Sequence, residues 1–161
     1  MYNLSNFGTV DHIAIAVLDL DEAIRYHTDV LGFRLDSIRD TAGKNSGMRS
    51  AVLFSEQFSV VLLVSTSEGS QIEKYINKYG PGVQHIAFAC EDIETVRSDL
   101  IDKGMQFATD VLKADGLKQS FTKRDENTGM MYELIERSGN FNFEDQNVNN
   151  LFEQLESNDL Y

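Results

Sequence analysis

The sequence predicts an α+β fold in which two β-α-β-β-β modules form a cupped, half-barrel mixed sheet, followed by a C-terminal helix. The main observation is a repeated motif: residues 10–17 read VDHIAIAV, and residues 83–90 read VQHIAFAC. Each copy places a histidine near the start of a short apolar run, and a helix-like segment follows each copy. An internal repeat of this kind indicates that the fold consists of two similar units.

Module one, about residues 8–66, begins with an apolar run rich in β-branched residues that is typical of a buried strand. Asp19 or Asp21 can cap a helix over residues 20–30, and Gly32 lies near its end. The small, polar residues 41–47 predict a loop. The predicted strands of this module are residues 12–17, 33–39, 49–54 and 59–64.

A linker, residues 67–82, separates the modules and contains a helix over residues 71–79. Module two, about residues 83–137, repeats the order of elements, with a helix over residues 93–103. Its predicted strands are residues 83–90, 106–112, 118–123 and 130–137. Apolar residues at helical spacing predict a C-terminal helix over about residues 142–157, and we expect a single domain over residues 1–161.

Composition and charge restrict the classes of partner. The net charge is −12, which argues against binding to nucleic acid or to an anionic membrane. The single cysteine, Cys90, allows no disulfide within the chain, and we expect it to be buried. We find no apolar run long enough to span a membrane and no signal peptide, so we expect a cytoplasmic protein. The exposed edges of a half-barrel favour a homodimer.

Three residues predict a metal site. His12 and His85 occupy matched positions in the repeat, and Glu133 lies in the last predicted strand, where a buried carboxylate is costly unless it is paired or bound to a cation. A histidine on an apolar strand is more often a core residue, but the matched positions favour a metal ligand. Two imidazoles and one carboxylate with open positions are typical of non-haem Fe(II) oxygenases, although Co, Zn, Mn or Ni bind such a set too. His27 has no counterpart in module two, and we interpret it as structural.

The chain resembles a known superfamily in these same segments. The paired modules resemble the vicinal oxygen chelate, or glyoxalase, superfamily, and within it the C-terminal catalytic half of the 4-hydroxyphenylpyruvate dioxygenase family. The resemblance spans residues 8–155, and the tail NVNNLF resembles the closing helix of that family. It is strongest in residues 48–50, 70–75, 82–87, 119–123 and 133–137.

The resemblance implies roles for individual residues. It places the three iron ligands at His12, His85 and Glu133, with no further catalytic residue. It places substrate-binding residues at Ser50, Gln71, Gln84, Gln119, Phe121 and Asn147. Neutral amides can hold the polar end of a substrate without competing for the metal, and an aromatic wall suits an apolar side chain. The implied activity is that of an Fe(II)-dependent dioxygenase, which uses dioxygen to decarboxylate and hydroxylate a small-molecule 2-oxo acid.

The chain departs from this family at three places, and other members of the superfamily offer alternatives. The N-terminal half of the family has no counterpart here, a long insertion is reduced to residues 113–117, and Ser65 replaces an asparagine. Methylmalonyl-CoA epimerase and glyoxalase I use a fourth protein ligand, whose position falls on Val61 in an entirely apolar run. A non-enzymatic small-molecule-binding protein of the same fold would leave the two histidines and Glu133 unexplained.

Overall fold

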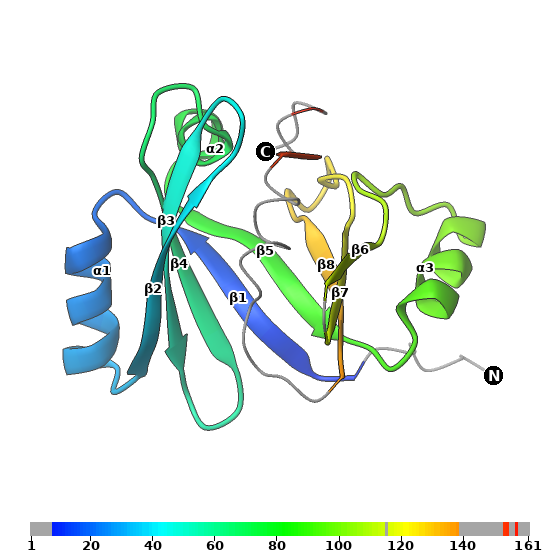
Figure 1. The fold of residues 1–161 in the computed structure, drawn as a ribbon, viewed down its shortest axis with the longest axis horizontal. Helices are drawn as coiled ribbons and strands as arrows, with labels where there is room; N and C mark the ends of the chain where they lie inside the picture. The colour runs from blue at the N-terminus through cyan, green and yellow to red at the C-terminus, as the bar shows by residue number, and fades with distance from the viewer. Residues whose placement is uncertain (1–7, 115, 139–152, 155–156, 158–161) are drawn as a thin grey trace.

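The two repeated strands lie side by side at the centre of one mixed sheet. The computed structural model describes residues 8–114, 116–138, 153–154 and 157. Strands β1 (Val10–Ala16) and β5 (Gly82–Ala89) pair antiparallel, with Ala14 opposite His85. The sheet has eight strands in the order β2-β3-β4-β1-β5-β8-β7-β6, so the repeated strands form the joint between its two halves (Figure 1).

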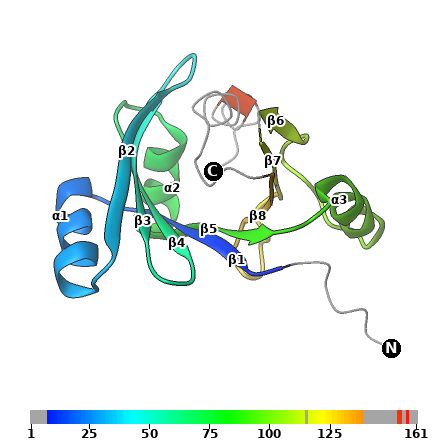
Figure 2. The same cartoon turned by 60° about the horizontal axis from the view of Figure 1, so that its bottom comes forward.

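The remaining strands extend from this joint in the same way in both halves. β4 pairs in parallel with β1, and β8 pairs in parallel with β5, whereas all other neighbouring strands are antiparallel. Both edges of the sheet curl toward the same side (Figure 2), which confirms the predicted cupped half-barrel of two β-α-β-β-β modules. The bounds are β2 (Arg34–Ala42), β3 (Gly47–Phe54), β4 (Ser59–Ser65), β6 (Leu112–Ala114), β7 (Leu117–Phe121) and β8 (Tyr132–Arg137).

Each α-helix in the two modules and the linker begins at a side-chain cap. Asp19, Ser70 and Asp92 accept hydrogen bonds from backbone N–H groups three residues later, which otherwise lack a partner at a helix start. The helix predicted over residues 20–30 is present, and its second half is wound as a π-helix. The helices are α1 (Leu20–Arg25), η1 (Tyr26–Val30), α2 (Gln71–Tyr79) and α3 (Ile93–Asp102).

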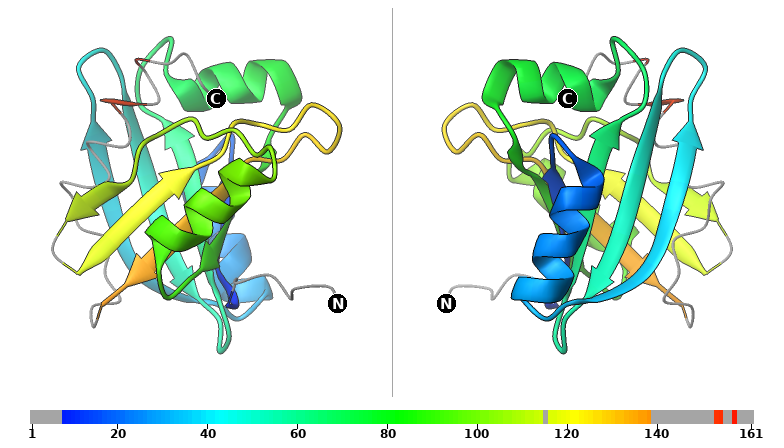
Figure 3. Two further views of the ribbon diagram at one scale, coloured as in Figure 1. Left: turned by 90° about the vertical axis from the view of Figure 1, so that its right-hand side faces the viewer. Right: turned by 90° about the vertical axis from the view of Figure 1, so that its left-hand side faces the viewer.

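Two of these helices cover the outer face of the sheet, one on each module (Figure 3). Leu20 of α1 packs on Leu53 and Leu62, which are fully buried. Ile93 of α3 packs with Leu134 and with Cys90, whose thiol pKa burial raises to about 11, in agreement with a structural cysteine. This apolar packing on the outer face leaves the inner face of the central strands available for a functional site.

The structure corrects two predicted boundaries. The strand predicted over residues 106–112 is wrong: within it Phe107 forms only an isolated bridge to Thr122, and β6 begins at Leu112. The residues between Phe107 and Leu112 bind the backbone of Phe121 instead: the Phe121 N–H donates to Thr109 Oγ1, and the Phe121 carbonyl accepts from the Ala108 N–H. The loop predicted over residues 41–47 is shorter, because β2 extends to Ala42 and β3 begins at Gly47.

The predicted C-terminal helix, residues 142–157, lies largely outside the described residues. Within it Glu153, Gln154 and Ser157 are described, and all three are helical. Among the helices that the structure describes, none has the length and apolar character needed to cross a lipid bilayer.

Candidate metal centre

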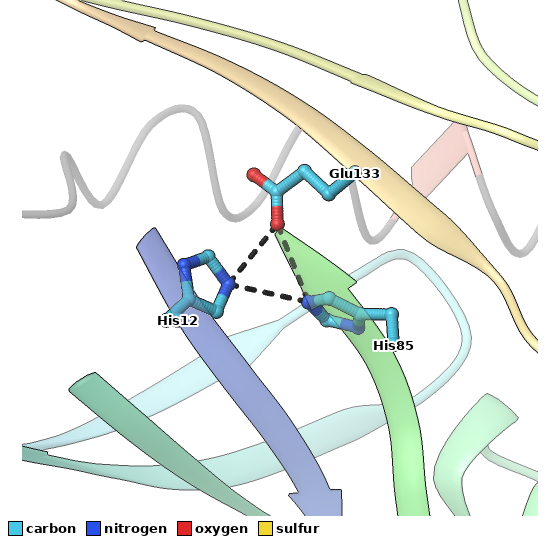
Figure 4. A group of neighbouring side chains, drawn as sticks. All are labelled: His12, His85 and Glu133. Atoms are coloured by element: carbon cyan, nitrogen blue, oxygen red, sulfur yellow. Dashed lines mark hydrogen bonds and ion pairs between the residues drawn. The ribbon is translucent and has the colours of Figure 1, made fainter. Parts of the chain in front are cut away.

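Three side chains from the joint point toward one another on the inner face of the sheet (Figure 4). They are His12 of β1, His85 of β5 and Glu133 of β8. Glu133 Oε2 lies 3.1 Å from His12 Nε2 and 3.3 Å from His85 Nε2, and the two Nε2 atoms are 3.3 Å apart. The exposed fractions are 2% for His12, 9% for His85 and 1% for Glu133, so the group is closed off from bulk water.

The strand arrangement explains why these distant residues meet. β1 and β5 are neighbours because they are the equivalent strands of the two modules, and β8 is the next strand beyond β5. Ala14 and Ala87, which pair beside the histidines, are fully buried. Their small side chains leave room for the imidazole rings to meet across the joint.

Each histidine is held at its other ring nitrogen. His12 Nδ1 lies 2.8 Å from Asp11 Oδ1, and His85 Nδ1 is hydrogen-bonded to Gln84 Oε1. An oxygen acceptor at Nδ1 requires a proton there, so the neutral ring keeps a lone pair on Nε2, which faces the centre. Metal-ligating histidines are commonly oriented in this way.

Two residues of this arrangement were missed in the sequence. Arg137 donates two hydrogen bonds to Asp11: Nε lies 2.8 Å from Oδ2, and Nη2 lies 2.9 Å from Oδ1. The position of Asp11 directly before His12, matched by Gln84 before His85, is a signal that could have identified Asp11. Arg137 carries no local signal, because it is 126 residues away from Asp11.

The electrostatics of the centre follow from this burial and pairing. Burial alone lowers the pKa of His12, but the carboxylates of Glu133 and Asp11 outweigh it and raise the pKa to about 9. Burial dominates at His85 and lowers its pKa. Burial opposes ionisation of Glu133, yet His12 and His85 hold its pKa below the usual range. Without an ion, a protonated His12 therefore balances the buried, ionised carboxylate of Glu133.

Metal binding should consequently depend on pH. Because an ion must displace the proton of His12, we expect apparent affinity for Co(II) to rise about tenfold per pH unit between about pH 7 and 9 and then level off. Calorimetric titration in buffers of different ionisation enthalpy should detect one released proton. The stability of the metal-free protein has the opposite pH dependence. The raised pKa of His12 contributes to the free energy of unfolding in full below pH 6.5, and this contribution is lost as the pH rises through about 9. Affinity independent of pH, with no proton released, would contradict this prediction.

The residues fit a divalent ion. Their three ligand atoms are 3.1 to 3.3 Å apart, which matches the spacing of neighbouring ligands when each bond to a first-row ion is about 2.1 Å long. Glu133 Oε1 is buried and has no hydrogen-bond partner among the described residues, as expected of an atom that faces a ligand. Neutral imidazole and carboxylate suit Fe(II), Mn, Co, Ni and Zn. Among the described residues no further side chain of histidine, cysteine, aspartate or glutamate joins the group as a fourth ligand.

Four of the residues predicted to bind substrate are buried in β3, β7 and α2. Phe121 of β7 is 2% exposed, and its ring lies edge-on to His85 at 5.2 Å between centroids. Gln119, also 2% exposed, lies two residues before Phe121, and no partner for its Oε1 is present in the described part of the chain. Ser50 is buried on β3, opposite Leu63 of β4. Gln71, the first residue of α2, is buried as well.

The side chain of Gln84 contacts a histidine of the centre. The amide oxygen of Gln84 is engaged by His85, and its nitrogen lies 4.0 Å from the sulfur of Met131, so this side chain orients a histidine. Asn147 lies outside the described residues. Val61, the position at which the resemblance places a fourth ligand in the alternative enzymes, is a buried aliphatic residue opposite Ala14.

The fold and the site together define a paired-module protein with a two-histidine, one-carboxylate centre at the joint. The family model of the Glyoxalase/Bleomycin resistance protein/Dioxygenase superfamily matches residues 11–122. The chain therefore belongs to this superfamily, in agreement with the resemblance noted in its sequence.

Individual relatives fall into two groups. A probable 4-hydroxyphenylpyruvate dioxygenase of Aspergillus fumigatus is 35% identical over 96 residues, which are 55% of this chain and 24% of that protein. A variant of 4-hydroxymandelate synthase from Streptomyces coelicolor has the same fold, with a TM-score of 0.84 at 21% identity over 94% of this chain and 54% of that one. Methylmalonyl-CoA epimerase from Mycobacterium tuberculosis has a TM-score of 0.71 at 27% identity, over 86% of this chain and 93% of the epimerase. The chain thus spans about a quarter of the length of the dioxygenase relative.

Proposed function

We propose that this protein is an Fe(II)-dependent dioxygenase that oxidatively decarboxylates and hydroxylates a 2-oxo acid. The observation that carries the proposal is the buried group of His12, His85 and Glu133, which no further histidine, cysteine, aspartate or glutamate joins among the described residues. Two histidines and one carboxylate leave coordination positions for a chelating substrate and dioxygen. The similarity to a 4-hydroxyphenylpyruvate dioxygenase supports the same reaction class.

The protein's own side chains prepare the site for this chemistry. A bound Fe(II) would supply the activation of dioxygen and a chelation point for the 2-oxo acid. His12 and His85 would hold the ion through Nε2, while Asp11 and Gln84 keep the rings oriented. Phe121 closes one side of the centre against water, because its ring packs against His85. Gln119 Oε1, buried and without a partner in the described residues, is available to accept a hydrogen bond from the substrate.

A metal-dependent epimerase is the second candidate function. The similarity to methylmalonyl-CoA epimerase supports it, because this chain matches 93% of that protein's length. The valine at position 61 counts against it, since an aliphatic side chain cannot supply a fourth metal ligand.

The two candidates differ in a simple spectroscopic test. Anaerobic addition of Fe(II) and a 2-oxo acid to the purified protein should give a weak visible charge-transfer band, and admission of air should bleach it with uptake of oxygen. A panel of aromatic and branched 2-oxo acids would identify the preferred side chain. In the His85→Ala variant the band should be lost. Absence of the band with every 2-oxo acid, together with tight Co(II) binding and exchange of a substrate C–H proton, would favour the epimerase.

A further inference from the structure

Each histidine of the centre follows an extra residue in its strand. The register between β1 and β5 shifts between Val10 and His12, so Asp11 has no residue opposite it on β5. It shifts again between Ala14 and Ile15, so Gln84 has no residue opposite it on β1. Such β-bulges redirect side chains relative to a regular strand. Here both bulged residues turn toward the ring of the following histidine and contact its Nδ1. The two modules therefore present their histidines by the same local device.

The two bulges are held in different ways. In module two the Gln84 carbonyl accepts from Arg124, 3.0 Å away, and the Gln84 side chain is neutral. In module one the side chain of Asp11 is itself held, because Arg137 donates to both carboxylate oxygens at 2.8 and 2.9 Å. The side chains of Asp11 and Arg137 are only 14% and 15% exposed, so this ion pair is largely shielded from water. A forked pair of this kind defines the plane of the carboxylate as well as its position.

The partner of Asp11 comes from the strand that also supplies a metal ligand. Arg137 and Glu133 lie four residues apart on β8 and therefore on the same face of the sheet. One strand thus contributes the carboxylate of the centre and the guanidinium that orients the histidine opposite it. β8 is not a neighbour of β1, since β5 lies between them, so the contact between Asp11 and Arg137 reaches across a strand.

We propose that Asp11 and Arg137 form a positioning pair: Arg137 orients the carboxylate of Asp11, which directs Nε2 of His12 toward the metal ion. The inference rests on the metal site of the proposed function and adds two residues to it. Without the guanidinium the carboxylate of Asp11 is free to rotate, and the ring of His12 is then no longer held in one orientation at Nδ1. Because Arg137 and Glu133 share a strand, the pair also links the position of His12 to that of the carboxylate ligand.

The test compares two arginine variants. Arg137→Gln removes the fork at the centre, whereas Arg49→Gln removes a fork of the same geometry at the surface, where Arg49 contacts Asp40 at 2.7 and 2.9 Å and its side chain is 52% exposed. Titration with Co(II), followed by its visible absorption, reports affinity and ligand geometry together. We expect Arg137→Gln to bind Co(II) about 10–100-fold more weakly with an altered spectrum, and Arg49→Gln to match the parent protein. Arg137→Lys should recover only part of the affinity, because lysine keeps the charge but not the fork.

Two controls distinguish loss of positioning from unfolding of the variant: a milder substitution, and the melting temperature of each metal-free protein. Asp11→Asn retains an acceptor for His12 but loses the ion pair, and it too should weaken Co(II) binding while the protein remains folded. Parental affinity and spectrum in folded Arg137→Gln and Asp11→Asn proteins would overturn the positioning role and leave the metal site intact. An affinity loss equal to the unfolded fraction in both variants would also overturn it. Failure of the parent protein to bind Co(II) or Fe(II) would instead overturn the proposed function itself.

Discussion

Replacing Glu133 by glutamine is expected to abolish tight metal binding and, with it, oxygen uptake. Glu133 is the one anionic member of the group, and its Oε2 lies within 3.3 Å of both histidines. Glutamine preserves the shape of the side chain but removes the negative charge that attracts a divalent ion. We expect the affinity for Co(II) to fall by well over about 100-fold, because loss of an outer partner of a ligand already costs about 10–100-fold.

A glutamate on the same strand provides the matched control. Glu136 binds Lys118 at 2.7 Å through one oxygen and accepts from the N–H of Ile93 through the other, away from the centre. Glu136→Gln should retain parental Co(II) affinity in the same titration, although it weakens the contact at the start of α3. Tight binding by Glu133→Gln, or equal losses in the two variants, would show that the metal site is assigned wrongly.

Truncating Phe121 to alanine should have the largest effect on stability. Phe121 is among the largest fully buried side chains of the described residues, and its ring supports His85. Removing a buried phenylalanine ring costs about 3–5 kcal/mol, because apolar burial is lost and a cavity remains. Urea denaturation of the metal-free protein, monitored by circular dichroism, measures this change in the free energy of unfolding.

Two comparisons separate packing from function at this position. Phe121→Leu should lose less stability, because leucine fills most of the cavity, but it should still impair substrate binding if the aromatic ring lines the site. Phe88→Ala removes a partly buried ring that packs against Tyr132, and it should cost less than Phe121→Ala. A Phe121→Ala protein as stable as the parent would show that the ring is not part of the core.

Errors in the predicted elements arose where local pattern and tertiary contacts disagree. Residues 106–112 fit a predicted strand, yet Phe107 forms only an isolated bridge to Thr122, and the hydroxyl of Thr109 accepts a hydrogen bond from the N–H of Phe121. By contrast, the helix predicted over residues 71–79 agrees with α2 at both ends, because Ser70 caps its start and Gly80, at positive φ, ends it.

The resemblance to the superfamily implied the cupped sheet, and the sequence by itself determined the repeated modules and the identity of the three candidate ligands. These depend on local periodicity, on capping residues and on the chemistry of histidine and carboxylate, all of which can be read along the chain. The tertiary structure decided which atoms meet and what holds them: the bulges at Asp11 and Gln84, and the fork of Arg137 on Asp11. Strand register and contacts between residues 126 positions apart set these features, and no local pattern encodes either.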